Sequence, residues 1–268
     1  MNSNVAISIL TMAGLGFFFA LVLAFVSRKL KVKGNPLVEK IEEILPGVNC
    51  GACGFTSCRQ YAEALAKGQA PIDGCKAGGN AVLCALAGIL GKEVKEGLKK
   101  LAIVHCGADA SSRKKKAIYN GIKTCKAAGN MMGGEIVCRY GCLGYGDCRD
   151  ACPFDAITII NGLPKIDKNK CTACEKCVIV CPRNIISVEE ITTKNFMYVS
   201  CSSLEKGAQT RKACSVGCIA CGLCQKFSGS IFFVKDNLAH VQYNKLADIK
   251  NKDEVITKCP TKCITLVN

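Results

Sequence analysis

The chain has 268 residues, of which 22 are cysteines, and a formal net charge of +15 from 36 Lys and Arg against 21 Asp and Glu. A disulfide scaffold is excluded, because such scaffolds are short secreted chains and these cysteines follow metal-cluster spacings that need a reducing compartment. Aromatic residues make up 6% and Trp is absent, so we expect metal sites rather than large apolar cores to organise several small domains.

The positive charge is smaller once metal is counted. An oxidised [4Fe–4S] cluster with four thiolates carries about −2, so four clusters would reduce +15 to about +7. A basic chain can bind nucleic acid, but no basic motif here is interleaved with aromatic residues. We therefore expect no nucleic-acid partner.

Residues 1–30 are predicted to be a transmembrane anchor in contact with lipid. The stretch from Val5 to Val26 has no charge and as a helix would be about 33 Å long, enough to cross a hydrocarbon core of about 30 Å. A signal peptide is disfavoured because no basic residue precedes this stretch. Basic residues follow it, at Arg28, Lys29, Lys31 and Lys33, so the positive-inside rule places the N-terminus outside and the remainder in the cytoplasm.

Residues 31–100 are predicted to form a small helical domain with four cysteines. Asn35 and Pro36 begin a helix that Pro46 and Gly47 end, and further helices are expected over 58–68 and 78–101. Between them lies the pattern C-x2-C-x4-C-x16-C. These cysteines indicate a self-contained [4Fe–4S] site, with zinc as the alternative: Cys50, Cys53, Cys58 and Cys75.

Residues 101–133 are interpreted as a connecting segment. A short strand is expected over 101–106, and His105 is expected to be structural rather than a ligand. The run from Ser111 to Lys116 is typical of a solvated basic loop, which could also attract an acidic partner such as a soluble ferredoxin.

Residues 134–195 carry the cysteine run of a two-cluster bacterial ferredoxin, with each of two blocks ending in Cys-Pro. In such a run, three close cysteines bind three corners of a cluster, and the fourth ligand comes from the Cys-Pro of the other block. Zinc would favour separated C-x2-C pairs. One predicted ligand set is Cys138, Cys142, Cys148 and Cys181. The other is Cys152, Cys171, Cys174 and Cys177.

An internal repeat runs through the second half of the chain. The segments beginning at Cys152, Cys181 and Cys259 share one frame, in which Cys-Pro is followed by two variable residues and then by a pair of apolar residues. In that frame Cys263 occupies the position of Ala156 and Ile185, which favours a small buried residue rather than a ligand. After the first Cys-Pro, Asn161-Gly162 between two apolar runs predicts a β-hairpin.

Residues 196–268 are predicted to be a degenerate ferredoxin-like domain with one cluster. Ser228 stands where a fourth cysteine is expected, and residues 245–255 lack the second triplet. The four cysteines that this pattern retains form the ligand set of one cluster, with three from a triplet and the fourth from a distant Cys-Pro: Cys218, Cys221, Cys224 and Cys259. Six others have no assigned role, and the sequence leaves open whether some form a fifth cluster: Cys84, Cys106, Cys125, Cys201, Cys214 and Cys263.

The order of these parts resembles the B subunit of the Rnf complex, a membrane-bound ferredoxin-oxidising ion pump. The resemblance covers nearly the whole chain and is most specific at the first four-cysteine pattern and at residues 141–157. It implies an α+β fold with ferredoxin-like βαβ pseudo-repeats. It also implies that electrons pass from reduced ferredoxin through the clusters to membrane subunits carrying flavins and iron, coupled to Na⁺ or H⁺ movement, and end on NAD⁺ or another acceptor.

The sequence contains no catalytic base, nucleophile or nucleotide-binding glycine motif, so the chain is interpreted as an electron-transfer subunit of a translocating oxidoreductase. Three alternatives remain at this stage. They are a polyferredoxin subunit of a formate- or hydrogenase-type membrane dehydrogenase, a membrane-tethered redox sensor, and a structural zinc protein.

Overall fold

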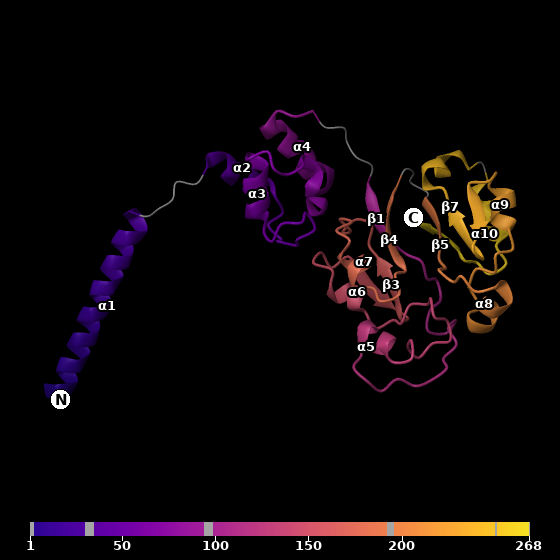
Figure 1. The fold of residues 1–268 in the computed structure, drawn as a ribbon, viewed down its shortest axis with the longest axis horizontal. Coiled ribbons are helices and arrows are strands. Elements are labelled where there is room, and N and C mark those ends of the chain that lie inside the picture. The colour runs from indigo at the N-terminus through magenta and orange to yellow at the C-terminus, as the bar shows by residue number, and fades with distance from the viewer. Residues whose placement is uncertain (1–2, 30–34, 94–98, 192–195, 250, 268) are drawn as a thin grey trace.

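The computed structural model describes residues 3–29, 35–93, 99–191, 196–249 and 251–267. Helix α1 (Ser3–Lys29) contains a 21-residue stretch, Ile7–Ser27, that is long and apolar enough to cross a membrane, and none of it is buried against the rest of the chain. Figure 1 shows this helix apart from the other elements. The Thr11 hydroxyl donates to the Ile7 carbonyl at 3.0 Å, which satisfies the donor within the helix. Lys31 and Lys33 lie outside the described residues.

A small helical unit follows the anchor. It contains α2 (Pro36–Ile44), α3 (Cys58–Ala66) and α4 (Gly79–Leu90), with short 3₁₀ turns at Ile72–Gly74 and Lys76–Gly78. The Asn35 side chain accepts from the Leu37 N–H at 3.0 Å and caps α2, as predicted. The side chains of Ile41, Tyr61 and Leu86 are fully buried and form the core of this unit.

Helix α4 is shorter than the sequence suggested. The apolar pattern predicted a helix over 78–101, but α4 ends at Leu90, where Gly91 adopts a left-handed φ of 62°. A glycine reaches this conformation without the Cβ penalty that other residues pay, and it therefore terminates the helix. Residues 94–98 lie outside the described part of the chain.

The first ferredoxin-like unit has the order β–α–α–β–β–α–β. Its elements are β1 (Lys100–Val104), α5 (Cys125–Asn130), α6 (Asp147–Asp150), β2 (Ile157–Ile160), β3 (Leu163–Ile166), α7 (Lys176–Val180) and β4 (Ile186–Glu190). Antiparallel pairs join β1 to β4 and β2 to β3. Asn161 and Gly162 both have positive φ between β2 and β3, which confirms the predicted hairpin.

The second unit repeats this order. Its elements are β5 (Phe196–Val199), α8 (Gly207–Ala213), α9 (Leu223–Phe227), β6 (Phe232–Lys235), β7 (Leu238–Val241), the 3₁₀ turn Tyr243–Asp248, α10 (Lys252–Thr257) and β8 (Ile264–Val267). Again the outer strands pair, β5 with β8, and the middle strands pair, β6 with β7 (Figure 1). Helix α10 stands where α7 stands in the first unit but carries no cysteine.

The repeat inferred from the sequence is visible in the backbone. The third residue after each Cys of a Cys-Pro pair has a left-handed conformation, with φ of 48° at Asp155, 51° at Asn184 and 52° at Lys262. The next residue is buried in each copy, and a strand begins one residue later. Cys263 is one of these buried residues, at 3% exposed.

The segment 101–133 does more than connect two domains. Its first residues form β1 of the first unit, and α5 lies close to the cysteines of the same unit. Within the basic run, Arg113 is only 9% exposed, so this residue is not part of a solvated loop. Its guanidinium group donates to the Cys142 carbonyl and, at 3.0 Å, to the Gly162 carbonyl.

The two ferredoxin-like units are joined by hydrogen bonds from the same segment. The Gly107 N–H donates to the Ser200 carbonyl at 2.9 Å, and the Ser202 hydroxyl donates to the His105 carbonyl at 2.8 Å. A β-bridge pairs Arg113 with Cys214. Residues 105–114 therefore lie at the boundary between the two units.

We expect the close approach of the Gly144 and Gly162 backbones to be essential for the stability of the first unit. Gly144 has a φ of +84°, and a Cβ there would lie 2.7 Å from the Gly162 carbonyl oxygen. Gly144→Ala should combine a left-handed strain of about 1–2 kcal/mol with a backbone clash, and lower the temperature at which cluster absorbance is lost. Gly133→Ala is the matched control, because its φ is +70° and nothing lies within 4 Å of the added Cβ. Equal shifts in the two variants would contradict this account.

Candidate iron–sulfur cluster sites

The N-terminal cavity is enclosed by the helical unit and is lined by the four cysteines predicted for it: Cys50, Cys53, Cys58 and Cys75. Ser57 caps α3 by accepting from the Gln60 N–H at 3.2 Å, which places Cys58 in the first helical turn. The Cys58 N–H donates to Asn49 at 2.7 Å and ties the two sides of the cysteine loop together. Burial and the charge of Cys75 raise the pKa of Tyr61 to about 12, and its hydroxyl donates to the Pro71 carbonyl at 2.8 Å.

The second core cavity lies in the first ferredoxin-like unit and also has the predicted set of sulfurs: Cys152, Cys171, Cys174 and Cys177. Ala173 and Glu175 have φ of 56° and 65°, which turns the loop tightly so that its three cysteines face the same cavity. Burial, followed by the neighbouring thiols, raises the pKa of Cys177 to about 12.

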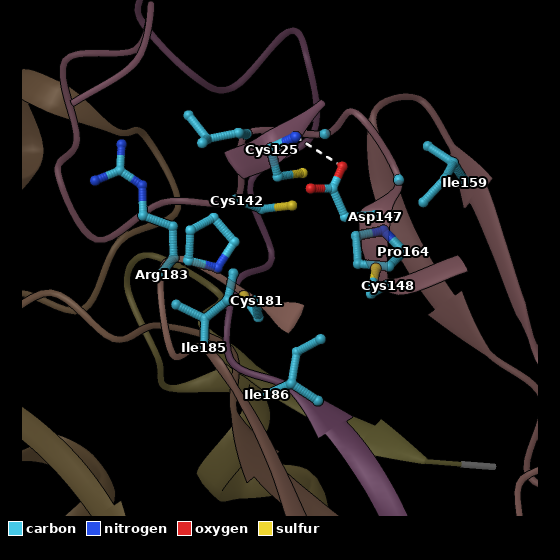
Figure 2. Close-up of a pocket in the computed structure, with 14 residues that line it drawn as sticks. Cys125, Cys142, Asp147, Cys148, Ile159, Pro164, Cys181, Arg183, Ile185 and Ile186 are labelled. Atoms are coloured by element: carbon cyan, nitrogen blue, oxygen red, sulfur yellow. Dashed lines mark hydrogen bonds between the residues drawn. The ribbon is translucent and has the colours of Figure 1, made fainter. Parts of the chain in front are cut away.

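The first core cavity differs from the predicted set by one residue. It is lined by Cys125 together with Cys142, Cys148 and Cys181, and Figure 2 shows these sulfurs around a common space. Cys138, which the spacing assigned to this set, lines a different cavity. The structure thus places Cys125 where the sequence interpretation placed Cys138.

The position of Cys125 follows from local hydrogen bonds. Thr124 caps α5 by accepting from the Ala127 N–H at 3.2 Å. The Asp147 carboxylate accepts from the Cys125 N–H at 2.7 Å (Figure 2) and from the Lys126 N–H at 3.0 Å. These bonds hold the start of α5 against α6, which carries Cys148. No short cysteine motif precedes Cys125, so sequence spacing alone had no signal for this contact.

The C-terminal cavity contains the predicted cysteines and a fifth thiol. It is lined by Cys218, Cys221, Cys224, Cys259 and Cys263. The sulfurs of Cys259 and Cys263 are 3.7 Å apart. A hydrogen bond with Cys263 is the main cause that lowers the pKa of Cys218 to about 6 and that of Cys259 to about 5. The Cys263 thiol therefore lies within hydrogen-bonding distance of the Cys259 sulfur.

Ser228 occupies the position of the missing cysteine and has a structural contact there. Its hydroxyl accepts from the Phe232 N–H at 2.9 Å, and the side chain is 6% exposed. This contact anchors the start of β6. Ser228 thus has a structural role in the unit that lacks the second group of three cysteines.

The junction cavity lies between the two ferredoxin-like units. It is lined by Cys106, Cys138, Cys201 and Cys214. Of these four, the sequence had assigned only Cys138 to a cluster. His105 also lines this cavity, but its two ring nitrogens lie 2.8 Å from the Val199 carbonyl and 2.8 Å from the Ser187 hydroxyl. Both nitrogens are engaged, which agrees with the expected structural role. Cys84 is exposed and lines none of these five cavities.

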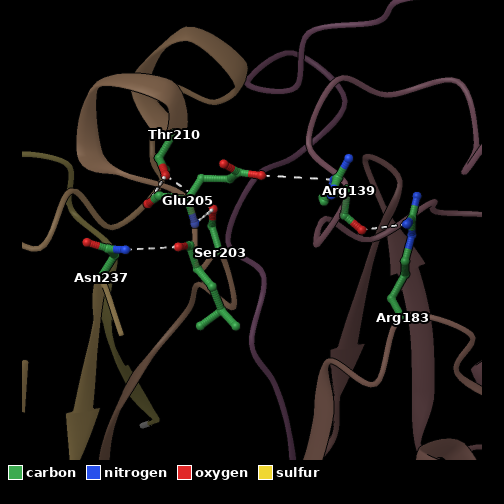
Figure 3. A network of polar contacts seen from close by, with 7 residues as sticks. Arg139, Arg183, Ser203, Glu205, Thr210 and Asn237 are labelled. Carbon is green, nitrogen blue, oxygen red and sulfur yellow. Dashed lines mark hydrogen bonds and ion pairs between the residues drawn. The ribbon is translucent and has the colours of Figure 1, made fainter. Parts of the chain in front are cut away.

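Two arginines place positive charge beside the sulfurs. Arg113 is buried next to Cys142 and lowers the pKa of that thiol, although burial and Cys106 raise it to about 12 overall. Arg183 lies near Cys138 and Cys181 and donates to the carbonyl groups of Arg139 and Gly133 (Figures 2 and 3). Because a cluster with four thiolates carries about −2, nearby guanidinium groups stabilise it.

The arrangement of sulfurs fits a polynuclear cluster. A single tetrahedral zinc ion needs its sulfurs at about 2.3 Å. Within the described ranges, no three His, Cys, Asp or Glu side chains converge closely enough to hold one metal ion. Cysteines spaced around mainly apolar cavities instead fit [4Fe–4S] clusters.

Comparisons with known proteins agree with this chemistry. Residues 45–77 match the family model described as a putative Fe–S cluster, and residues 164–187 match the 4Fe–4S binding domain. These two matches cover the N-terminal cavity and part of the second core cavity.

Relatives extend over nearly the whole chain. The B subunit of the proton-translocating ferredoxin:NAD⁺ oxidoreductase complex of Clostridium ljungdahlii is 39% identical, over 100% of this chain and 94% of the relative. The Na⁺-translocating counterpart from Acetobacterium woodii is 38% identical, over 93% and 74%. The B subunit of an ion-translocating oxidoreductase complex of Methanosarcina acetivorans is 35% identical, over 99% and 100%.

We predict that Cys125→Ala removes one cluster. The substitution takes one sulfur from the first core cavity, so the anaerobically purified chain should lose about four iron atoms and the corresponding EPR signal on reduction. Cys84→Ala is the control, since Cys84 is exposed and outside the cavities. Full iron content in Cys125→Ala would mean that this residue is not a ligand.

Cys263→Ala should change a reduction potential rather than iron content. Loss of the thiol that lies 3.7 Å from the Cys259 sulfur removes a hydrogen-bond donor to a cluster ligand and destabilises the more negative reduced state, so the potential of the C-terminal cluster should fall. An EPR-monitored redox titration measures this shift. Loss of about four iron atoms would instead identify Cys263 as a ligand.

Proposed function

The chain belongs to the B subunits of Rnf-type ion-translocating oxidoreductase complexes, and on this premise we propose that it takes electrons from reduced ferredoxin and relays them through [4Fe–4S] clusters to the flavin- and iron-carrying membrane subunits of its complex. It is the electron-transfer subunit of a ferredoxin:NAD⁺ oxidoreductase that couples this transfer to ion translocation. When bound, each cluster supplies one-electron transfer at potentials that reach about −400 mV in ferredoxins.

The observation that carries the proposal is the succession of cysteine cavities behind an apolar helix. Cys50 of the N-terminal cavity is near enough to Cys174 of the second core cavity for its charge to raise the pKa of that thiol, after burial and Cys152. Cys177 of the second core cavity is similarly close to Cys148 of the first. Cysteines of the N-terminal, second core and first core cavities are thus near enough to interact electrostatically, which supports a relay through these three sites.

The direction of transfer is proposed from exposure and chain order. Cys221 of the C-terminal cavity is exposed, whereas the other cysteines that line the cavities are buried or half-buried. A soluble ferredoxin would therefore approach closest at this end of the chain. The N-terminal cavity follows the anchor helix directly in sequence and would pass electrons to the membrane subunits.

The anchor is proposed to hold the clusters on the cytoplasmic side. Helix α1 is long enough to span a bilayer, and the sequence places basic residues after it and none before it. In this orientation the N-terminus lies outside, and the cysteine cavities share the compartment of soluble ferredoxin. A reducing compartment also keeps thiolates available to iron.

Cys53→Ala tests the relay and its direction. Loss of the N-terminal cluster should leave the remaining clusters reducible by ferredoxin in the purified complex, while electron transfer to the membrane subunits falls to background. The two measurements are the EPR signal after ferredoxin addition and the reduction of the membrane flavins. Cys84→Ala should leave both unchanged. Continued flavin reduction in Cys53→Ala would show that the N-terminal cavity is not the exit.

A further inference from the structure

The junction cavity has the construction of a ligand site. It brings together cysteines from four separate segments, two from the first ferredoxin-like unit and two from the second. Three glycines in its wall lie against their neighbours so closely that an added Cβ would come within 3.0 Å of another atom: Gly107, Gly141 and Gly217. The backbone is therefore packed tightly around the four sulfurs.

Backbone N–H groups are directed at two of the four sulfurs. The Cys142 N–H donates to the Cys106 sulfur and the Ser203 N–H to the Cys201 sulfur, each at 3.5 Å. Such N–H···S bonds stabilise thiolates, which is the form that binds iron.

A buried cation accompanies these sulfurs. Arg113 lines the junction cavity and is 9% exposed, and its side chain is held by the carbonyl groups of Asp109 and Gly162 at 3.1 and 3.0 Å. Its backbone pairs with that of Cys214. A fixed guanidinium beside four thiolates offsets the charge of about −2 that a bound cluster would carry.

The cavity lies between two of the other cysteine sites. In the pair Cys138-x3-Cys142, Cys138 lines the junction cavity and Cys142 lines the first core cavity. The pair Cys214-x3-Cys218 divides in the same way between the junction and C-terminal cavities. The junction cavity thus adjoins a site in each ferredoxin-like unit.

We propose that the junction cavity binds a further [4Fe–4S] cluster through its four cysteines, and that this cluster links the first core site to the C-terminal site. Zinc is the competing metal, and the iron and zinc content of the purified chain separates the two. The second unit lost the partner cluster of its own ferredoxin pattern.

Iron content tests this directly, because five four-iron sites predict about twenty iron atoms per chain and four sites predict about sixteen. The full-length chain, purified without oxygen in detergent, should contain about twenty iron atoms and essentially no zinc. Cys106→Ala and Cys201→Ala, which remove sulfurs from different units, should each lose about four. The EPR signals of the two adjacent reduced clusters should also sharpen, because a nearby spin is gone.

Thr210→Val is the matched control. Thr210 lines the junction cavity and is 2% exposed, with its hydroxyl 3.1 Å from that of Ser203, so this variant disturbs the wall without removing a sulfur. It should keep all the iron. About sixteen iron atoms in the parent chain, unchanged iron in either cysteine variant, or the loss of one zinc atom would overturn the proposal. None of these measurements uses ferredoxin, so failure of the proposed relay would appear separately.

Discussion

The fold depends on four sulfurs from distant parts of the chain meeting around one space. In the first ferredoxin-like unit, each core cavity takes its last sulfur from a Cys-Pro segment on the far side of the unit. The apolar cores are small and each includes or adjoins cysteines, so little else can hold these loops together. Ligation would then contribute directly to folding, as in other small metal domains.

The two units show how a ferredoxin-like fold persists after losing half its ligands. Both keep the same strand pairing, and both turn after Cys-Pro through a left-handed residue. In the second unit, α10 replaces the cysteine-bearing α7, and Ser228 replaces a ligand with a hydrogen bond to the chain at β6. The buried strand residues Phe196 and Phe232 supply packing that the missing cluster does not. Apolar burial can thus substitute for ligation within one architecture.

Positively charged side chains beside the cysteines favour the binding of negatively charged clusters. Two of the positive charges lie beside cysteines: Arg113 is buried, and Arg183 is half-buried. Their guanidinium groups are held by backbone carbonyls, as Figure 3 shows for Arg183 and the Arg139 carbonyl, so the positive charge stays in place. Fixed charges and N–H···S bonds are the means by which a protein adjusts cluster potentials. The Arg139–Glu205 contact at 4.0 Å additionally spans the two units.

The sequence by itself determined the class of chemistry, the anchor helix, the repeat and three of the five cysteine sets, because these reside in short spacings and local patterns. It also identified the hairpin at Asn161-Gly162 and the buried position of Cys263. Only the tertiary structure decided that Cys125 rather than Cys138 faces the first core cavity, and that Cys138 joins Cys106, Cys201 and Cys214. Those sulfurs are separated by long, unpatterned stretches. Their meeting is set by the pairing of β1 with β4, the Asp147 bonds to α5 and the packing of one unit on the other, which no local motif records.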